Sequence, residues 1–464
     1  MQTNEPKKAN RPSGGKRKNP DDEDEGPDIV EVPEFVPTTK SKSFEYRVAV
    51  FFDGTSNSAT NTAAGPSIAD VGYLTRSYSS DYTNVWRMYQ HFKGYAPGSK
   101  GASKWDRVYL SGAGTTPMRY DDVVGTGLGV GKTGIYGKSQ EAIFRILALI
   151  NNFALRGDKI KLYVDVVGFS RGAATARYFM HRILPQGDNI LAGLAARNYG
   201  IDITHVEVPV AALFDTVSSY GSDFEDDVEQ LNLTAVRHVS EKAYHICAED
   251  EFRVNFSLTN IKSAIDIGKG WEAYLPGAHA DIGGGYPESV SEMTTTISYL
   301  GSSRPAARDA DWLIRMGYFT RAEINTTRFL LPTVSGPRLV RWRNSCSRDP
   351  VYHHYTFIPL NMMMDKAQLH GLRFDRTTMR RRYRIGGRIL PAVKRKIDAY
   401  VARVDADVRD NQAVWEVGGS GVDALPAQFR RRYCHYSASE SDLGMETRWL
   451  DISRALRKRK IFDG

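Results

Sequence analysis

Residues 159–185 read KIKLYVDVVGFSRGAATARYFMHRILP, and this stretch decides the fold class. The apolar run Lys159–Val167 predicts a buried strand, and the residues from Ala173 to Leu184 predict a helix. Between them, Gly168–Gly172 (GFSRG) matches the G-x-S-x-G turn that joins a strand to a helix and presents its serine. This context predicts a nucleophile, Ser170, at the positive end of a helix, where an oxyanion is favoured. The alternative is a tight turn with an incidental serine.

A serine hydroxyl becomes a strong nucleophile when a histidine takes its proton and a carboxylate orients that histidine. In α/β-hydrolases the order along the chain is serine, acid, histidine. His279 fits this order and lies in a glycine-rich stretch, residues 275–286 (LPGAHADIGGGY), whereas His245 lies inside an apolar run and is typical of a core histidine. Asp215 follows the apolar run Val206–Phe214 and is the predicted acid. An aspartate that only caps a turn is the alternative.

Backbone N–H groups are expected to complete the site by binding the oxyanion. One donor is expected at Arg171 and the other at Gly54 or Thr55, in the loop after the first apolar run. Loss of one such donor typically lowers the rate by about 10²–10³. Asp53, at the end of that run, and Asp281, beside the histidine, are expected to support the two loops. The predicted chemistry calls for no metal and no cofactor.

The order of apolar runs predicts an α/β fold, with a mostly parallel sheet covered by helices as in the α/β-hydrolases. In such sheets the reactive groups gather on loops beyond the carboxyl ends of the strands, where the predicted nucleophile and acid both lie. The apolar runs are Tyr46–Phe52, Lys159–Val167, Val206–Phe214 and Ala243–Ala248, and Ser139–Phe153 has helical spacing.

Composition divides the 464 residues into three parts. Residues 1–43 pass from a basic patch to an acidic one with Phe35 as their one aromatic residue, which predicts a disordered, charged tail. Residues 44–303 are expected to hold the catalytic domain. Residues 304–464 are rich in arginine and are expected to form a basic, largely helical accessory region. Its arginine clusters are most typical of a solvated face, and a face toward anionic lipid is the second interpretation.

Several classes of protein are disfavoured. Residues 125–133 (GTGLGVGKT) lack the spacing of a phosphate-binding loop, and the arginine clusters lack the interleaved aromatics of a nucleic-acid-binding module, so no nucleic acid is expected as a partner. The sequence has neither a run of 18 apolar residues nor an apolar segment typical of a secretory signal. Cys247, Cys346 and Cys434 are expected to be buried thiols rather than a disulfide framework or a zinc site.

Taken together, the motifs resemble those of the type VI secretion phospholipase effectors of the first lipase class. The resemblance runs in order from Phe44 to Pro287. On it, the family's nucleophile, acid and base fall on Ser170, Asp215 and His279. The matching motifs are FFDGT (51–55), TNV (83–85), GDKI (157–160), GFSRGA (168–173), FDTV (214–217), His245 with DEFR (250–253), and PGAHADIGGGY (276–286).

The resemblance implies an antibacterial phospholipase, of A1 or A2 type, that hydrolyses acyl esters of membrane phospholipids. It implies synthesis in a bacterial cytoplasm without a signal peptide, and delivery by type VI secretion to the membrane of a rival cell's periplasm. The implied partners are a secretion spike component and a cognate immunity protein, and the region after residue 304 is the candidate for membrane contact. Two alternatives stay open: a soluble carboxylesterase or thioesterase with the same triad, and an interaction protein with a silent hydrolase fold.

Overall fold

The computed structural model describes the chain from residue 41 onward, with gaps. The described residues are 41–65, 75–122, 131–218, 227–332, 338–409, 425–426, 428–442, 444–450 and 457–464, without the side chains of 406–409. The tail predicted for residues 1–43 lies outside the described residues up to residue 40, and so does most of the loop 125–133.

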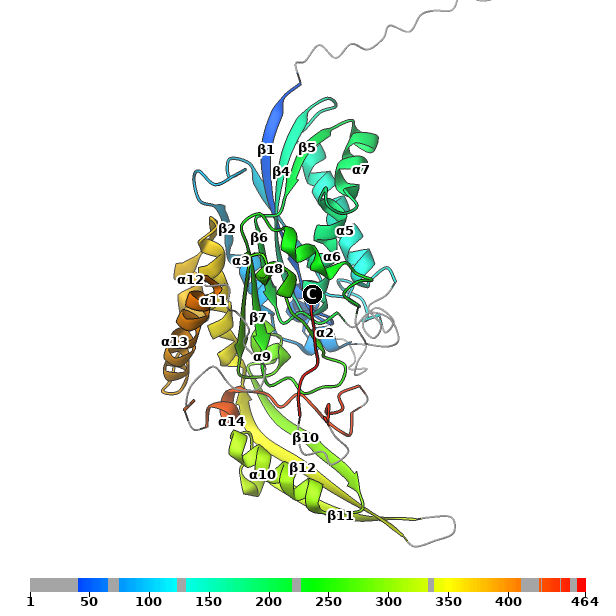
Figure 1. Cartoon of the computed structure of the whole chain (residues 1–464), viewed down its shortest axis with the longest axis vertical. Coiled ribbons are helices and arrows are strands. Elements are labelled where there is room, and N and C mark those ends of the chain that lie inside the picture. Colours follow the sequence, from blue (N-terminus) through cyan, green and yellow to red (C-terminus); the bar gives the residue numbers. More distant parts are fainter. Residues whose placement is uncertain are drawn as a thin grey trace, which may run out of the picture. The chain divides into compact units, whose positions relative to one another are not determined.

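A seven-stranded parallel sheet forms the centre of the fold, as the order of apolar runs predicted (Figure 1). The strand order is β3-β1-β4-β6-β7-β9, and β5 pairs with the first half of β4. Every pairing in this sheet is parallel, so the carboxyl ends of its strands lie at one edge. The strands are β1 (Ser43–Phe52), β3 (Trp105–Leu110), β4 (Lys159–Phe169), β5 (Asp202–Glu207), β6 (Val210–Phe214), β7 (Lys242–Ala248) and β9 (Gly270–Leu275).

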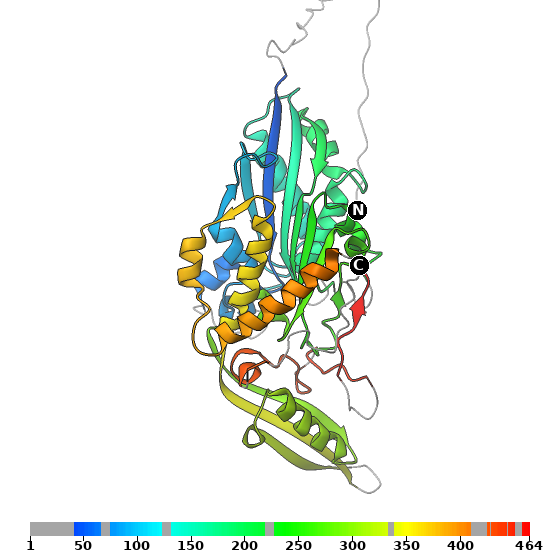
Figure 2. The same cartoon turned by 60° about the vertical axis from the view of Figure 1, so that its left-hand side comes forward.

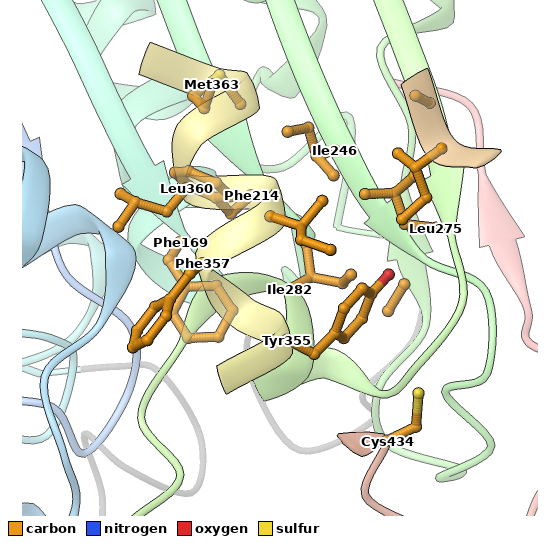
Figure 3. Close-up of a cluster of buried hydrophobic side chains, with 14 of the residues drawn as sticks. Phe169, Phe214, Ile246, Leu275, Ile282, Tyr355, Phe357, Leu360, Met363 and Cys434 are labelled. Atoms are coloured by element: carbon orange, nitrogen blue, oxygen red, sulfur yellow. The ribbon is translucent and has the colours of Figure 1, made fainter. Parts of the chain in front are cut away.

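Helices cover both faces of this sheet, because successive strand residues point to opposite faces. Phe51 packs into the core on one face and Phe52 into the core on the other. On the first of these faces, Leu360 and Met363 of α11 pack over Phe214 and its neighbours (Figure 3). Figures 1 and 2 show α3 (Asn84–His91), α11 (Phe357–Gln368) and α13 (Leu390–Arg409) on that face, and α5 (Ile135–Asn151), α6 (Arg171–Ile183) and α7 (Ile190–Tyr199) on the other.

The region after residue 303 is only in part what the sequence predicted. It is rich in helices, but β11 (Ile324–Leu331) and β12 (Leu339–Tyr352) also form an antiparallel sheet with β10 (Ser289–Leu300), which α10 (Arg304–Met316) covers. The boundary expected at residue 304 falls inside one compact unit, Ser41–Gly464. The reason is that α11 and α13 carry the apolar side chains that close one face of the parallel sheet. Among the described residues, no helix is long and apolar enough to span a bilayer.

Short elements tie the later part of the chain to the earlier part. β13 (Leu372–Phe374) pairs with β2 (Phe92–Tyr95), and β14 (Ile461–Phe462) pairs with β8 (Leu258–Thr259). The other short elements are α1 (Ala59–Ala64), α2 (Arg76–Ser79), α8 (Lys262–Ile265), α9 (His279–Gly283), α12 (Arg376–Arg382) and α14 (Phe429–Tyr433), with 3-10 turns at Leu233–His238, Arg321–Glu323 and His353–Thr356.

The turn between β4 and α6 is closed by backbone contacts that only glycine permits. Ser170 has φ 58° and ψ −130°, a strained conformation for a residue with a side chain. A Cβ atom on Gly172 would lie 2.3 Å from the carbonyl oxygens of Phe52 and Asp53. A Cβ atom on Gly168 would lie 2.6 Å from the backbone of α6. The two glycines of the motif therefore let β1 and α6 pack directly against the serine turn.

Replacing Gly172 by alanine is expected to lower the free energy of unfolding by about 1–3 kcal/mol, because the new methyl group overlaps the backbone at the end of β1. Gly193→Ala is the matched control: Gly193 is exposed inside α7, and nothing lies within 4 Å of its Cβ position. That change is expected to raise the free energy of unfolding by about 0.5–1 kcal/mol. Urea denaturation measures both, and equal effects of the two changes would contradict the close packing of the turn.

Candidate active site

Ser170 and Asp215 follow neighbouring strands at the carboxyl edge of the sheet. Phe169 of β4 pairs with Phe214 of β6, and each of the two site residues comes next in its chain. The backbone N–H of Ser170 donates to the carbonyl of Phe214 at 3.1 Å. Both residues have positive φ values, 58° for Ser170 and 41° for Asp215. The backbone thus turns sharply at both positions, directly beyond the strands.

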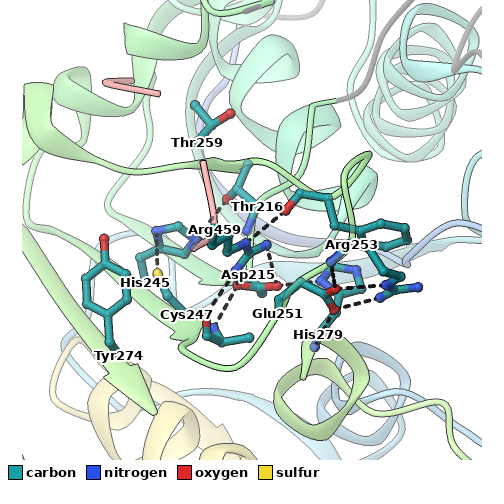
Figure 4. Close-up of polar contacts among 12 residues, drawn as sticks. Asp215, Thr216, His245, Cys247, Glu251, Arg253, Thr259, Tyr274, His279 and Arg459 are labelled. Carbon is teal, nitrogen blue, oxygen red and sulfur yellow. Dashed lines mark hydrogen bonds and ion pairs between the residues drawn. The ribbon is translucent and has the colours of Figure 1, made fainter. Parts of the chain in front are cut away.

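Asp215 and His279, the predicted acid and base, lie within hydrogen-bond distance of each other (Figure 4). Asp215 Oδ2 lies 2.5 Å from His279 Nδ1, and Asp215 Oδ1 accepts the backbone N–H of Ala248 at 2.8 Å. Both side chains are buried. Because Asp215 occupies Nδ1, it selects the tautomer in which Nε2 is the free base.

The His279 ring lies beside the serine turn. It packs against Phe169, the residue before Ser170, with ring centroids 4.6 Å apart, and against the edge of Phe256 at 5.1 Å. Within the described residues the Ser170 hydroxyl has no hydrogen-bond partner, so the structure brings together acid and base but does not join the serine to the histidine. Such contacts are often long without substrate and tighten in the reacting complex.

A buried arginine, Arg459, also holds the carboxylate of Asp215. Its Nη1 donates to Oδ1 at 2.6 Å and its Nη2 to Oδ2 at 2.9 Å. Burial alone would raise the pKa of Asp215, but Arg459 and His279 hold that pKa well below its ordinary value. Burial also lowers the pKa of His279, although Asp215 opposes this shift, so His279 is neutral and able to accept a proton near pH 7.

Sequence reasoning missed Arg459, because Arg457–Lys460 has the pattern of a solvated basic cluster. The structure corrects this interpretation: the side chains of Arg457 and Arg459 are both buried. Arg457 pairs with Asp309 of α10 rather than with the site.

Glu251 and Arg253, from the DEFR motif, fix the start of α9. Glu251 accepts the backbone N–H of His279 at 3.2 Å and two bonds from the Arg253 guanidinium, at 2.8 and 2.9 Å. Burial would raise the pKa of Glu251, but Arg253 lowers it to about 2. The hydroxyl of Ser437 also donates to Glu251. The motif therefore positions the histidine loop by a buried ion pair.

Asp281 and Asp53, the predicted supporting residues, each accept hydrogen bonds in or between the loops of the site. Asp281 accepts the N–H of Ala278 at 2.9 Å, and its other oxygen lies 2.7 Å from His435 Nδ1. Asp53 accepts bonds from the hydroxyls of Thr83 and Tyr109, at 2.7 and 2.6 Å, and burial raises its pKa to about 6.

One of the predicted oxyanion donors is already engaged. Asp53 accepts the N–H of Gly54 at 2.7 Å, which removes Gly54 from the set. Arg171, at the start of α6, and Thr55 are the other two predicted donors.

His245 is the core histidine that its apolar setting predicted. Its Nδ1 lies 2.8 Å from Glu272, and its Nε2 accepts the N–H of Thr216 at 3.0 Å. Together with Cys247 these side chains place three potential metal-binding atoms within 4.8 Å of one another. Both histidine nitrogens are already used within the protein, and burial raises the pKa of the Cys247 thiol well above its ordinary value. The group therefore anchors the residue after Asp215 rather than fitting a metal.

Comparison with known proteins supports the resemblance seen in the motifs. Residues 194–303 match the family model described as the catalytic domain of Tle1-like phospholipase effectors of type VI secretion. The fold is similar to that in the structure of the Tle1 effector bound to the VgrG spike from the Type 6 secretion system. That similarity has 20% identity and a TM-score of 0.55, and it covers 91% of this chain and 95% of that chain.

A second solved structure, the crystal structure of an uncharacterized protein from Pseudomonas aeruginosa, has 14% identity and a TM-score of 0.36. The similarity covers 80% of this chain and 53% of that chain. No curated protein matches the sequence. The family model and the Tle1 fold confirm the predicted resemblance and the α/β-hydrolase-like architecture.

Glu251→Gln is expected to lower the free energy of unfolding by about 3–5 kcal/mol, because it leaves Arg253 buried without its counter-charge. The control is Asp266→Asn, which breaks an exposed pair with Lys262 and is expected to change stability by less than about 1 kcal/mol. Chemical denaturation of both variants near pH 7 measures the difference.

The stabilisation of the folded chain by Glu251 is expected to decrease as the pH falls. The ionised Glu251 carboxylate is favoured in the folded chain, where its pKa is about 2 against an ordinary 4.5. Its stabilisation is present above pH 4.5 and is lost as pH falls toward 2. The stability gap between the parent and Glu251→Gln therefore narrows over this interval, and a gap that stays constant would contradict the assignment.

Proposed function

We propose that this chain is a serine-dependent phospholipase of type A1 or A2, in which Ser170, Asp215 and His279 form the triad. The observation that carries the proposal is the buried Asp215–His279 pair, set beside a G-x-S-x-G turn at the carboxyl edge of a parallel sheet. The match of residues 194–303 to the Tle1-like catalytic domain supports a lipase-type hydrolase.

In the proposed reaction, His279 Nε2 takes the proton of the Ser170 hydroxyl as its oxygen attacks the acyl carbonyl. The N–H groups of Arg171 and Thr55 stabilise the resulting oxyanion. His279 then gives its proton to the departing glycerol oxygen, which releases a lysophospholipid and leaves an acyl-serine. Water, deprotonated by His279, hydrolyses the acyl-serine to a free fatty acid and restores the serine.

The proposed setting is antibacterial secretion. The similar Tle1 effector is bound to a VgrG spike, and we extend a spike partner to this chain. We also propose that the chain is delivered to the periplasm of a rival cell, where membrane phospholipid is within reach. A cognate immunity protein would protect the producing cell.

The three-stranded sheet is the proposed membrane contact. Large apolar side chains are exposed on its strands: Phe329 and Leu330 are 39% and 49% exposed on β11, and Leu339 is 50% exposed on β12. The cation of Arg343 lies 5.1 Å from the centre of the Phe329 ring. Apolar side chains with neighbouring arginines suit an interface with anionic lipid.

Ser170→Ala is expected to abolish phospholipid hydrolysis while leaving the fold intact. Mass spectrometry of mixed bacterial phospholipids should show lysophospholipid and free fatty acid in equal amounts with the parent chain and neither with the variant. Ser139→Ala, a buried serine on α5, is the control and keeps activity. An unchanged lipid profile with the parent chain would remove the phospholipase proposal, and turnover of soluble esters alone would favour an esterase.

The double change Phe329→Glu with Leu330→Glu is expected to weaken binding to anionic vesicles about tenfold or more, because burial of one such side chain contributes about 1.5–3 kcal/mol. Hydrolysis of a monomeric ester should be unchanged. Phe144→Glu on α5, where Phe144 is 53% exposed, is the matched control and should bind vesicles like the parent. Equal vesicle sedimentation of the double variant and the parent would place the membrane contact elsewhere.

A further inference from the structure

The guanidinium of Arg459 binds the same carboxylate, Asp215, that contacts the predicted catalytic histidine. It forms a two-bond fork with the Asp215 carboxylate, and it also donates to the carbonyls of Ala248 at 3.0 Å and Phe256 at 2.8 Å. The side chain is buried, and the interaction with Asp215 raises its pKa although burial opposes this. The cation is therefore permanently charged and rigidly held.

A short strand delivers this arginine from a distant part of the chain. Arg459 and Asp215 are 244 residues apart, and β14 brings them together by pairing in parallel with β8. Further bonds secure the segment 457–464: Leu258 N–H to the Lys460 carbonyl at 2.9 Å, and Ser263 N–H to the Gly464 carbonyl at 2.8 Å. The segment thus completes the acid's surroundings only when it is docked on β8.

We propose that Arg459 is a positioning residue of the triad, which fixes the plane of the Asp215 carboxylate toward His279 and limits the basicity of that histidine. The planar fork of an arginine matches a carboxylate at two oxygens, so it sets the carboxylate's orientation as well as its charge. Asp215 Oδ2 contacts both Arg459 Nη2 and His279 Nδ1. The orientation that the arginine gives this carboxylate therefore also sets the direction of its bond to the histidine.

The charges around His279 show why this matters for a proton acceptor. Two carboxylates, Asp215 and Glu251, and the guanidinium of Arg253 act on His279. The guanidinium of Arg459 acts in turn on both of these carboxylates. With neutral His279 these charges cancel. Without Arg459, Asp215 would act on the imidazolium alone and would hold the proton on His279 more strongly.

The test is the titration of His279, followed by NMR of the full chain with labelled histidine. In Arg459→Met the pKa of His279 is expected to rise by about one unit or more relative to the parent. In Arg459→Lys, which keeps the charge but loses the fork, it should stay within a few tenths of a unit of the parent. Arg457→Met is the matched control: the Arg457 side chain is also buried in this segment, but it pairs with Asp309. That variant should leave the His279 titration unchanged.

Hydrolysis of a monomeric ester gives a second readout, and this part rests on the proposed function. Arg459→Met is expected to lower kcat by about 10²-fold, with the acid limb of kcat/KM moving upward in pH by the same amount as the NMR titration. Arg459→Lys should lower kcat by about tenfold with KM unchanged, because only the orientation is lost.

The possible outcomes distinguish the positioning role of Arg459 from the proposed hydrolase function. A folded Arg459→Met with an unchanged His279 titration would make the arginine purely structural and overturn the inference. If Arg459→Met does not fold, Arg459→Lys decides: parent-like kcat would overturn the inference, and reduced kcat with parent-like titration would support it. If Arg459→Met shifts the His279 titration but the parent chain hydrolyses no ester, the coupling of Arg459 to His279 is supported and the proposed function is contradicted.

Discussion

A fully buried carboxylate needs compensating partners, and the fold around Asp215 supplies them. Removing a carboxylate from water is unfavourable unless cations and N–H groups replace the lost solvent. Asp215 receives a histidine, an arginine fork and a backbone N–H, each from a different segment. Because all of these groups must be in place for the charge to be stable, the carboxyl ends of β6 and β7, the start of α9 and the segment 457–464 are fixed relative to one another.

The same principle organises the shell around this carboxylate. Three segments around the site each carry a buried acid: Asp53 after β1, Glu251 after β7 and Asp281 in α9. Each acid accepts at least one backbone N–H of its own loop or its neighbour. Loops are usually the most mobile parts of a fold. Here they are held by charge-assisted bonds, which suits a site whose reacting atoms must be placed to within a fraction of an ångström.

The sequence predicted the parts of the site that depend on local pattern. Ser170, Asp215 and His279 were predicted because a glycine-bounded turn, a strand end and a glycine-rich loop are visible over a few residues, and the structure places Asp215 against His279. Arg459 was not, because its partner lies 244 residues away and its neighbours resemble a solvated basic cluster. The basic accessory region expected after residue 303 was described incompletely for a similar reason: its arginines dominate the composition, while its apolar residues close the parallel sheet.

A covalent probe tests the central claim, that Ser170 is a nucleophile activated by the Asp215–His279 pair. The chain is treated with a fluorophosphonate, which phosphonylates activated serines, and the modified peptide is located by mass spectrometry. If the pair activates Ser170, the adduct lies on Ser170 and its formation slows by orders of magnitude in His279→Ala. Labelling of a different serine, or labelling of Ser170 at the same rate without His279, would contradict the proposed catalytic triad.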